Sequence, residues 1–134
     1  MTELGTEIAL NLDFDGAVAR VTEALAAEGF GVISRIDMDK AFREKIGVEF
    51  RRYTILGACN PKLAHKAVSA RPDVGLLLPC NITVEEASAG STVRIIDAAA
   101  MMGVAGLDAN PAIAELAEDA AARLGRVAAA LGHS

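Results

Sequence analysis

The sequence predicts one α+β domain with a mostly antiparallel sheet and helices packed on one face. The chain has 134 residues, of which 52% are apolar and 23% charged, and this composition suits a single folded core. Segments with strand-like alternation and segments with helical spacing follow one another along the chain, without a linker or repeat. The connections are short and two late strands form a hairpin, which favours antiparallel pairing.

The first third of the chain predicts a strand, a helix and a second strand. Apolar side chains alternate over Thr6–Leu12, as in a strand with one buried face. Asp13 is a suitable N-cap for the next helix, whose apolar residues recur every three or four positions until Gly29. The β-branched residues of Gly31–Ile36 then predict the second strand.

A short helix and a third strand follow. Asp37 is placed to cap a helix that ends at Gly47, since aspartate is common at N-caps and glycine at helix ends. The stretch Phe50–Cys59 has an aromatic and β-branched centre, which is typical of a strand. Neither face of this third strand is fully polar, which is one reason to expect a homodimer.

Two Asn-Pro pairs mark the starts of two helices. An asparagine side chain can cap a helix, and the fixed φ of proline suits the first helical position. The pair Asn60-Pro61 opens a helix over Lys62–Arg71, which Pro72 ends. The pair Asn110-Pro111 opens a long C-terminal helix with a continuous apolar stripe up to Leu131.

A hairpin between these two helices completes the predicted fold. Its strands are Val74–Glu85 and Ser91–Ala98, joined by a turn around residues 87–90. The succession is therefore β-α-β-(α)-β-α-β-β-α. Removing the last strand and helix leaves β-α-β-β-α-β, so a ferredoxin-like core with an extra strand and helix is the architectural alternative.

The acidic charge balance argues against two classes of partner. The formal net charge is −5 and the basic residues are scattered, so neither nucleic acid nor an anionic membrane surface is an expected partner. The first residues lack the pattern of a signal peptide, and the longest apolar run, Ala98–Leu107, is too short to span a bilayer. We therefore expect a cytoplasmic protein with two reduced cysteines.

Both cysteines precede an asparagine and lie beside a break in regular structure. Cys59 directly precedes a helix start, where the helix dipole favours a thiolate, although a small buried hydrophobe also suits this tight turn. Cys80 follows Pro79, which predicts an edge strand or a bulge. The cysteines approach each other if the third and fourth strands are neighbours. Structural, redox and metal-binding roles therefore all stay open.

The sequence contains no further motif for catalysis or for a cofactor. A phosphate cradle after Gly57 is not supported, because Pro61 has no N–H and no dinucleotide or Walker motif follows. No C-x-x-C is present and His65 is the nearest third metal ligand, so neither a metal nor a cofactor is expected. The spacing indicates no Ser–His–Asp or paired-carboxylate arrangement, and whether the chain is an enzyme stays undecided.

The motifs Ile55-Leu56-Gly57-Ala58-Cys59-Asn60-Pro61 and Leu77-Leu78-Pro79-Cys80-Asn81 resemble the family called domain of unknown function 302. Agreement over residues 29–31 and 45–50 extends the resemblance to nearly the whole chain. The resemblance implies a TBP-like β-α-β(4)-α fold, in which helices grip a curved, five-stranded antiparallel sheet. Because that family has no established activity, the resemblance implies a fold and no reaction.

We expect the segments Gly57–Pro61 and Leu76–Asn81 to form a pocket for a small molecule that the protein binds or senses. Strand ends held by a rigid sheet beside a helix start are common places for such a pocket. The expected ligand-binding residues are Tyr53, Cys59, Asn60, Cys80 and Asn81. The alternative function is thiol-based redox chemistry or transient metal handling by the two cysteines.

The same sequence also predicts a homodimer. The chain has an excess of apolar residues, and the apolar segment Met101–Leu107 has only weak helical periodicity. Association through an edge strand, or through this segment, would cover such surface.

Overall fold

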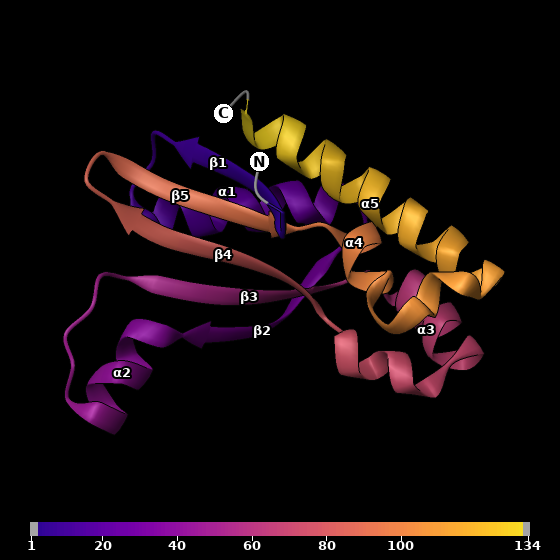
Figure 1. The fold of residues 1–134 in the computed structure, drawn as a ribbon. Coiled ribbons are helices and arrows are strands. Elements are labelled where there is room, and N and C mark those ends of the chain that lie inside the picture. Colours follow the sequence, from indigo (N-terminus) through magenta and orange to yellow (C-terminus); the bar gives the residue numbers. More distant parts are fainter. Residues whose placement is uncertain (1–2, 133–134) are drawn as a thin grey trace.

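The computed structural model describes residues 3–132 and contains one five-stranded sheet. The strands lie in the order β1-β5-β4-β3-β2, and every neighbouring pair is antiparallel. Figure 1 shows the sheet curving beneath its helices. The predicted α+β class and five-stranded antiparallel sheet are therefore confirmed. The strands are β1 (Gly5–Leu10), β2 (Gly31–Asp37), β3 (Tyr53–Cys59), β4 (Cys80–Ala87) and β5 (Gly90–Ile96).

Two long helices and three shorter ones accompany the sheet. The long helices, α1 (Phe14–Ala27) and α5 (Pro111–Gly132), lie next to each other on one face of the sheet (Figure 1). The shorter helices are α2 (Met38–Ile46), α3 (Pro61–Ala70) and α4 (Ala98–Met102), and two 3₁₀ turns, η1 (Pro72–Leu77) and η2 (Val104–Ala109), lie in the connections. α3, α4 and both turns gather at the end of the sheet where β3 ends and β4 begins (Figure 1).

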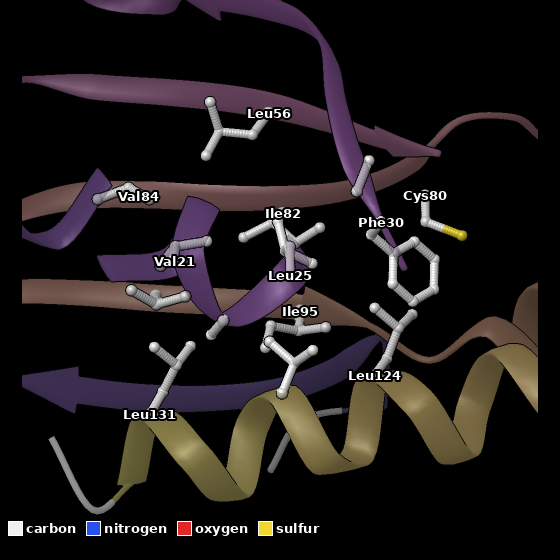
Figure 2. Packing of buried hydrophobic residues seen from close by; sticks show 14 of the residues in the cluster. Val21, Leu25, Phe30, Leu56, Cys80, Ile82, Val84, Ile95, Leu124 and Leu131 are labelled. Atoms are coloured by element: carbon white, nitrogen blue, oxygen red, sulfur yellow. The ribbon is translucent and has the colours of Figure 1, made fainter. Parts of the chain in front are cut away.

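The main core fills the space between the sheet and the two long helices. Side chains alternate along β4, so Ile82 and Val84 are fully buried while Thr83 between them points to the other face. Val21 and Leu25 of α1 and Leu131 of α5 close on them, as Figure 2 shows. Burying each of these side chains stabilises the fold by about 1.5–3 kcal/mol.

A second, smaller apolar cluster lies at the end of the sheet. It joins α3, η1, α4, η2 and α5 through Ala67, Val74, Met102, Leu107, Ile113 and Ala117. Met102 and Leu107, near the two ends of the apolar segment predicted as a contact surface, are both 7% exposed and close this cluster, whereas Val104 between them is exposed. This cluster forms one wall of the pocket described below.

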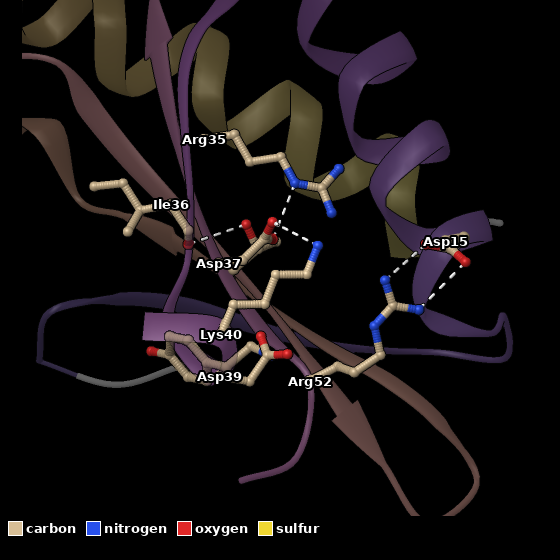
Figure 3. A network of polar contacts seen from close by, with 9 residues as sticks. Asp15, Arg35, Ile36, Asp37, Asp39, Lys40 and Arg52 are labelled. Carbon is tan, nitrogen blue, oxygen red and sulfur yellow. Dashed lines mark hydrogen bonds and ion pairs between the residues drawn. The ribbon is translucent and has the colours of Figure 1, made fainter. Parts of the chain in front are cut away.

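The predicted helix caps are largely confirmed. The Asp13 carboxylate accepts a hydrogen bond from the Gly16 N–H at 2.8 Å. Asn110 accepts bonds from the next turn at 2.9 and 3.3 Å. Asp37 precedes α2 without capping it, because its carboxylate binds the side chains of Arg35 and Lys40, at 3.1 and 3.6 Å (Figure 3).

Three details of the predicted strands are wrong. Residues 74–79 are not strand, because Pro72 starts a 3₁₀ turn that runs to Leu77. Pro79, which cannot donate to a ladder, lies immediately before β4. β4 lies between β3 and β5, so Pro79 marks neither an edge strand nor a bulge in β4. The third strand also begins later than predicted, at Tyr53.

The position of β1 excludes the ferredoxin-like alternative. β1 lies at one edge of the sheet and pairs with β5, from Gly5 opposite Ile96 to Leu10 opposite Ser91. Without β5, β1 would therefore have no neighbour in the described sheet. The last strand is thus a central part of the fold and no addition to a four-stranded core.

A charged cluster covers part of the sheet face opposite the core. Glu85 of β4 is only 8% exposed and accepts hydrogen bonds from Arg51 and, at 2.7 Å, from Arg94. Burial by itself would raise the pKa of Glu85, but the bonds from Arg94 and Arg51 outweigh burial and lower this pKa. The carboxylate therefore stabilises the fold above its ordinary pKa, and this contribution is lost as the pH falls through the lowered value.

We expect Glu85→Gln to lower the free energy of unfolding by about 1–2 kcal/mol at pH 7, since both arginines are partly exposed and their charges are screened. The difference from the wild type should shrink at acidic pH, once Glu85 is protonated. Urea unfolding at several pH values measures both effects. The exposed neighbour offers the control Glu86→Gln, which should change stability little. A loss for Glu85→Gln that is the same at pH 7 and at pH 3 would contradict this account.

Candidate ligand pocket

A pocket of about 320 Å³ opens where β3 ends and β4 begins. Its floor comes from the strand ends and its walls from α3, α4 and α5, so segments far apart in the sequence form it together. Most of the lining side chains are apolar, and they include Phe30, Leu63, Leu78, Met102, Ile113 and Leu116. Its volume lies within the range of small-molecule sites, and its apolar lining is typical of them.

Both cysteines contribute to the floor of this pocket. β3 and β4 are neighbours, and Ala58 lies opposite Cys80, so Cys59 is one residue beyond that pair. Both thiols are free and both line the pocket. A Cβ at position 57 would collide with the side chains of Ser34 and Pro79, so only glycine lets Pro79 pack against β3 here.

The two thiols differ in environment. Cys80 is 7% exposed and lies beside Phe30 at the end of the main core (Figure 2). Burial, together with a smaller contribution from the nearby Cys59, raises the pKa of Cys80 to about 11. Cys80 is therefore a neutral thiol at pH 7. Cys59 is less buried and lies directly before the cap of α3.

Asn60 places α3 along one side of the pocket. Its side-chain oxygen accepts a hydrogen bond from the Leu63 N–H at 3.3 Å, which confirms the predicted N-cap. Its amide nitrogen donates to the Glu28 carbonyl at 3.5 Å, and Asn60 is only 8% exposed. Both polar ends of this side chain thus have partners in the protein, and Asn60 orients the wall of the pocket.

A bulge in β2 adds a residue to the pocket that the sequence did not predict. Val32 lies opposite Ala58 and Ser34 opposite Gly57, so Ile33 is an extra residue between two regular pairs. The Ile33 side chain lines the pocket although it is 65% exposed. It therefore lies where the pocket meets solvent.

Of the five predicted ligand-binding residues, three line the pocket and two do not. Cys59, Asn60 and Cys80 come together there. Tyr53 is the first residue of β3, six residues before Cys59, which is about 20 Å along a strand. Asn81 is exposed and, by strand alternation, points to the opposite face from Cys80. Tyr53 and Asn81 thus lie away from this pocket.

Sequence reasoning also missed most of the pocket wall. α5 contributes Leu116, Ala117 and Ala120 to the lining. Phe30, which also lines the pocket, directly precedes β2. The alanines of α5 could have indicated a pocket beside this helix, because alanine leaves space that a larger side chain would fill. Their distance in sequence from Cys59 hid the connection.

The pocket has little capacity for charged groups or hard metal ions. None of its described lining residues carries a charged side chain. Over residues 3–132, no group of three His, Cys, Asp or Glu side chains is placed to hold a metal ion. His65 lies on the exposed side of α3. The arrangement therefore offers hydrocarbon surface and thiols.

The fold and this site define an α+β domain with an apolar pocket at the end of an antiparallel sheet. The chain belongs to the family described as Domain of unknown function DUF302, whose model matches residues 6–131. It is also similar to a solved structure, the crystal structure of an uncharacterized conserved protein DUF302 from Bacillus stearothermophilus. The two share 24% identity with a TM-score of 0.83, over 97% of this chain and 99% of the other, which shows the common fold.

Two further comparisons give negative results. No curated protein matches the chain. Within residues 3–132, no helix combines the length and the apolar character needed to cross a membrane.

We expect the two thiols to react with iodoacetamide at different rates. The thiol of Cys80 is buried and protonated at neutral pH, so the Cys59→Ser variant should be alkylated slowly, with a rate still rising above pH 10. The Cys80→Ser variant, which retains Cys59, should react faster at pH 8. Mass spectrometry of timed samples measures both rates, with urea-unfolded protein as the control for intrinsic reactivity. Equal rates in the folded variants at pH 8 would contradict the assignment.

Proposed function

We propose that this domain binds a small, neutral, apolar molecule in the pocket between β3, β4, α3 and α5. One observation carries the proposal, namely the open space of about 320 Å³ beside a well-packed core. Protein interiors are normally close-packed, and unfilled apolar space costs stability. A retained pocket of this size is therefore the main argument for a ligand.

The chemistry of the lining supports a neutral ligand. A buried carboxylate or ammonium group would need a partner of opposite charge, and the described lining residues provide none. Cys80 is uncharged at pH 7, and the Asn60 amide already has partners on both ends. Affinity would therefore come mainly from apolar area removed from water, at about 25 cal/mol per Å².

Small side chains keep the pocket open. Ala64 and Ala67 of α3 and Ala117 and Ala120 of α5 all line it. Larger residues at these positions would fill the space with the protein's own atoms. The partly exposed Ala120 offers a way to fill the pocket without disturbing a buried contact.

We expect Ala120→Phe to weaken binding of N-phenyl-1-naphthylamine, a neutral fluorescent probe, by about tenfold or more, because the new ring occupies the pocket. A titration followed by fluorescence measures the affinity. Ala129→Phe, on an exposed position of the same helix, is the matched control and should bind the probe as the wild type does. Melting curves establish that both variants are folded.

A wild-type protein that does not bind the probe, or two variants that bind it equally, would overturn the proposal. Native mass spectrometry of protein purified from its own host then identifies the natural ligand as an adduct that the probe displaces.

Thiol chemistry is the second candidate function. The observation that favours it is that both cysteines of the chain line the same pocket. A redox function needs at least one thiol that reacts in the folded protein. The alkylation experiment above measures this reactivity for each cysteine.

We also propose that the chain forms a homodimer through β2. β2 is an edge strand, and its Ile36 side chain is 51% exposed. An antiparallel pair of β2 strands centred on Ile36 would bring Arg35 opposite Asp37 of the second copy, which is a favourable cross-strand pair. The other predicted surfaces are less suitable, because Met102 and Leu107 are buried and β3 is a central strand.

Light scattering at micromolar concentration should therefore give twice the chain mass of 13.9 kDa for the wild type. Ile36→Lys should give the monomer mass, since the added charges would repel each other across the strand pair. Val104→Lys, at an exposed position on η2, is the control and should remain dimeric. A monomeric wild type would remove the proposal.

A further inference from the structure

We propose that α2 and the loop after it, residues 38–50, form an arm that covers the mouth of the pocket in a second copy of this chain. The inference rests on the two proposals above, the apolar pocket and the β2 dimer. It goes beyond them, because each pocket is then completed by residues of the other copy. Figure 1 shows the arm projecting from the sheet beyond the end of β2.

The arm is an ordered part of the chain. Asp39 is the buried residue of α2, and its carboxylate accepts a hydrogen bond from the Tyr53 N–H at 3.1 Å, which ties the helix to β3. The rings of Phe42 and Phe50 meet edge to face with their centroids 5.4 Å apart, so the loop folds back on the helix. Gly47, in the left-handed conformation with φ 66°, ends the helix between them.

This ordered arm exposes large apolar side chains. Ile46 is 68% exposed, Val48 45% and Phe50 37%. Single exposed apolar residues are common, but a group of them on one projecting element is typical of a surface that contacts another molecule. The arm is therefore a candidate docking surface.

The register of the proposed β2 pair leads each arm to the pocket of the other copy. A pair centred on Ile36 places position 38 of one copy beside position 34 of the other, and position 39 beside Ile33. Because the strands are antiparallel, α2 then runs toward the start of the other β2. At that start Gly31 pairs with Cys59, which lines the pocket. A helix of nine residues is about 14 Å long, so α2 extends past Ile33.

The pocket needs such a cover at Ile33. This side chain lines the pocket and is 65% exposed, so a ligand bound beside it would keep part of its apolar surface in water. Small-molecule sites commonly bury about 70–90% of the ligand surface. An apolar arm across this mouth would raise the buried share.

Two observations favour a second copy as the partner of the arm. β2 ends at Asp37, so the ladder centred on Ile36 includes residues 35–37 of each copy, whereas a stable interface buries about 800 Å² per partner. The arm directly follows this ladder and supplies further area. Its charges also balance, with three acidic and three basic residues within 38–50, although the whole chain has a net charge of −5. Identical copies can therefore meet at the arm without net repulsion.

The test is the naphthylamine titration, carried out with variants of the arm. Ile46→Ser leaves the pocket of its own chain unchanged but should weaken probe binding about fivefold or more, as truncation of an important interface residue does. Ile36→Lys, which separates the copies, should weaken probe binding to a similar extent. Leu4→Ser is the matched control, because Leu4 is 77% exposed beside β1, at the opposite edge of the sheet, and it should bind the probe as the wild type does.

Mixing two defective variants provides the decisive measurement. Ala120→Phe chains have a filled pocket and an intact arm, whereas Ile46→Ser chains have an open pocket and a defective arm. An excess of Ala120→Phe should therefore restore wild-type probe affinity to the Ile46→Ser chains, through dimers that contain one chain of each kind. A chain with both substitutions is the control and should restore nothing. Mixed dimers without a gain in affinity would overturn the proposal.

The same measurements separate this inference from the two proposals on which it rests. A wild type that does not bind the probe removes the pocket, and a monomeric wild type in light scattering removes the dimer. A wild type that is dimeric and binds the probe, together with an Ile46→Ser variant that binds it equally well, overturns the role of the arm alone.

Discussion

The arrangement of the pocket depends on one backbone carbonyl at the end of α1. Helices leave their last carbonyls without partners, and these groups need hydrogen bonds from elsewhere when they are covered. The Glu28 carbonyl accepts one bond from the Asn60 amide at 3.5 Å and another from the Arg123 guanidinium of α5 at 3.0 Å. A further bond of 2.8 Å joins Arg126 to the Glu28 carboxylate. The end of α1, the start of α3 and the middle of α5 are thereby held at one point.

This junction explains why the end of the sheet stays open. α3 and α5 both pass the strand ends beside this junction, and alanines of both helices line the pocket. Further along α5 the stripe changes to larger residues, and Leu124, Val127 and Leu131 are almost fully buried against α1 and the sheet. The same helix therefore closes the main core with its second half and borders a pocket with its first half, because of the side-chain sizes along one stripe.

Local chemistry accounts for the parts of the structure that could be predicted from the sequence. The Asn-Pro pairs at 60–61 and 110–111 mark helix starts because their side chains and fixed φ act within one turn. Cys59 and Cys80 were expected near each other because each lies at a strand end. The face of the sheet to which a side chain points was harder to predict, because it depends on where the strand begins. Asn81 is an example, since β4 begins at Cys80 and Asn81 therefore points away from the pocket. The bulge at Ile33 and the contribution of α5 depend on long-range packing, which no short pattern reports.

The deep position of Cys80 sets the chemistry of the pocket wall. Burial keeps the thiol protonated at pH 7, so this part of the wall is uncharged and suits hydrocarbon. A charged group placed here would need a partner of opposite charge, and the described lining residues contain none. The burial that makes Cys80 a poor nucleophile therefore also restricts the proposed site to neutral molecules.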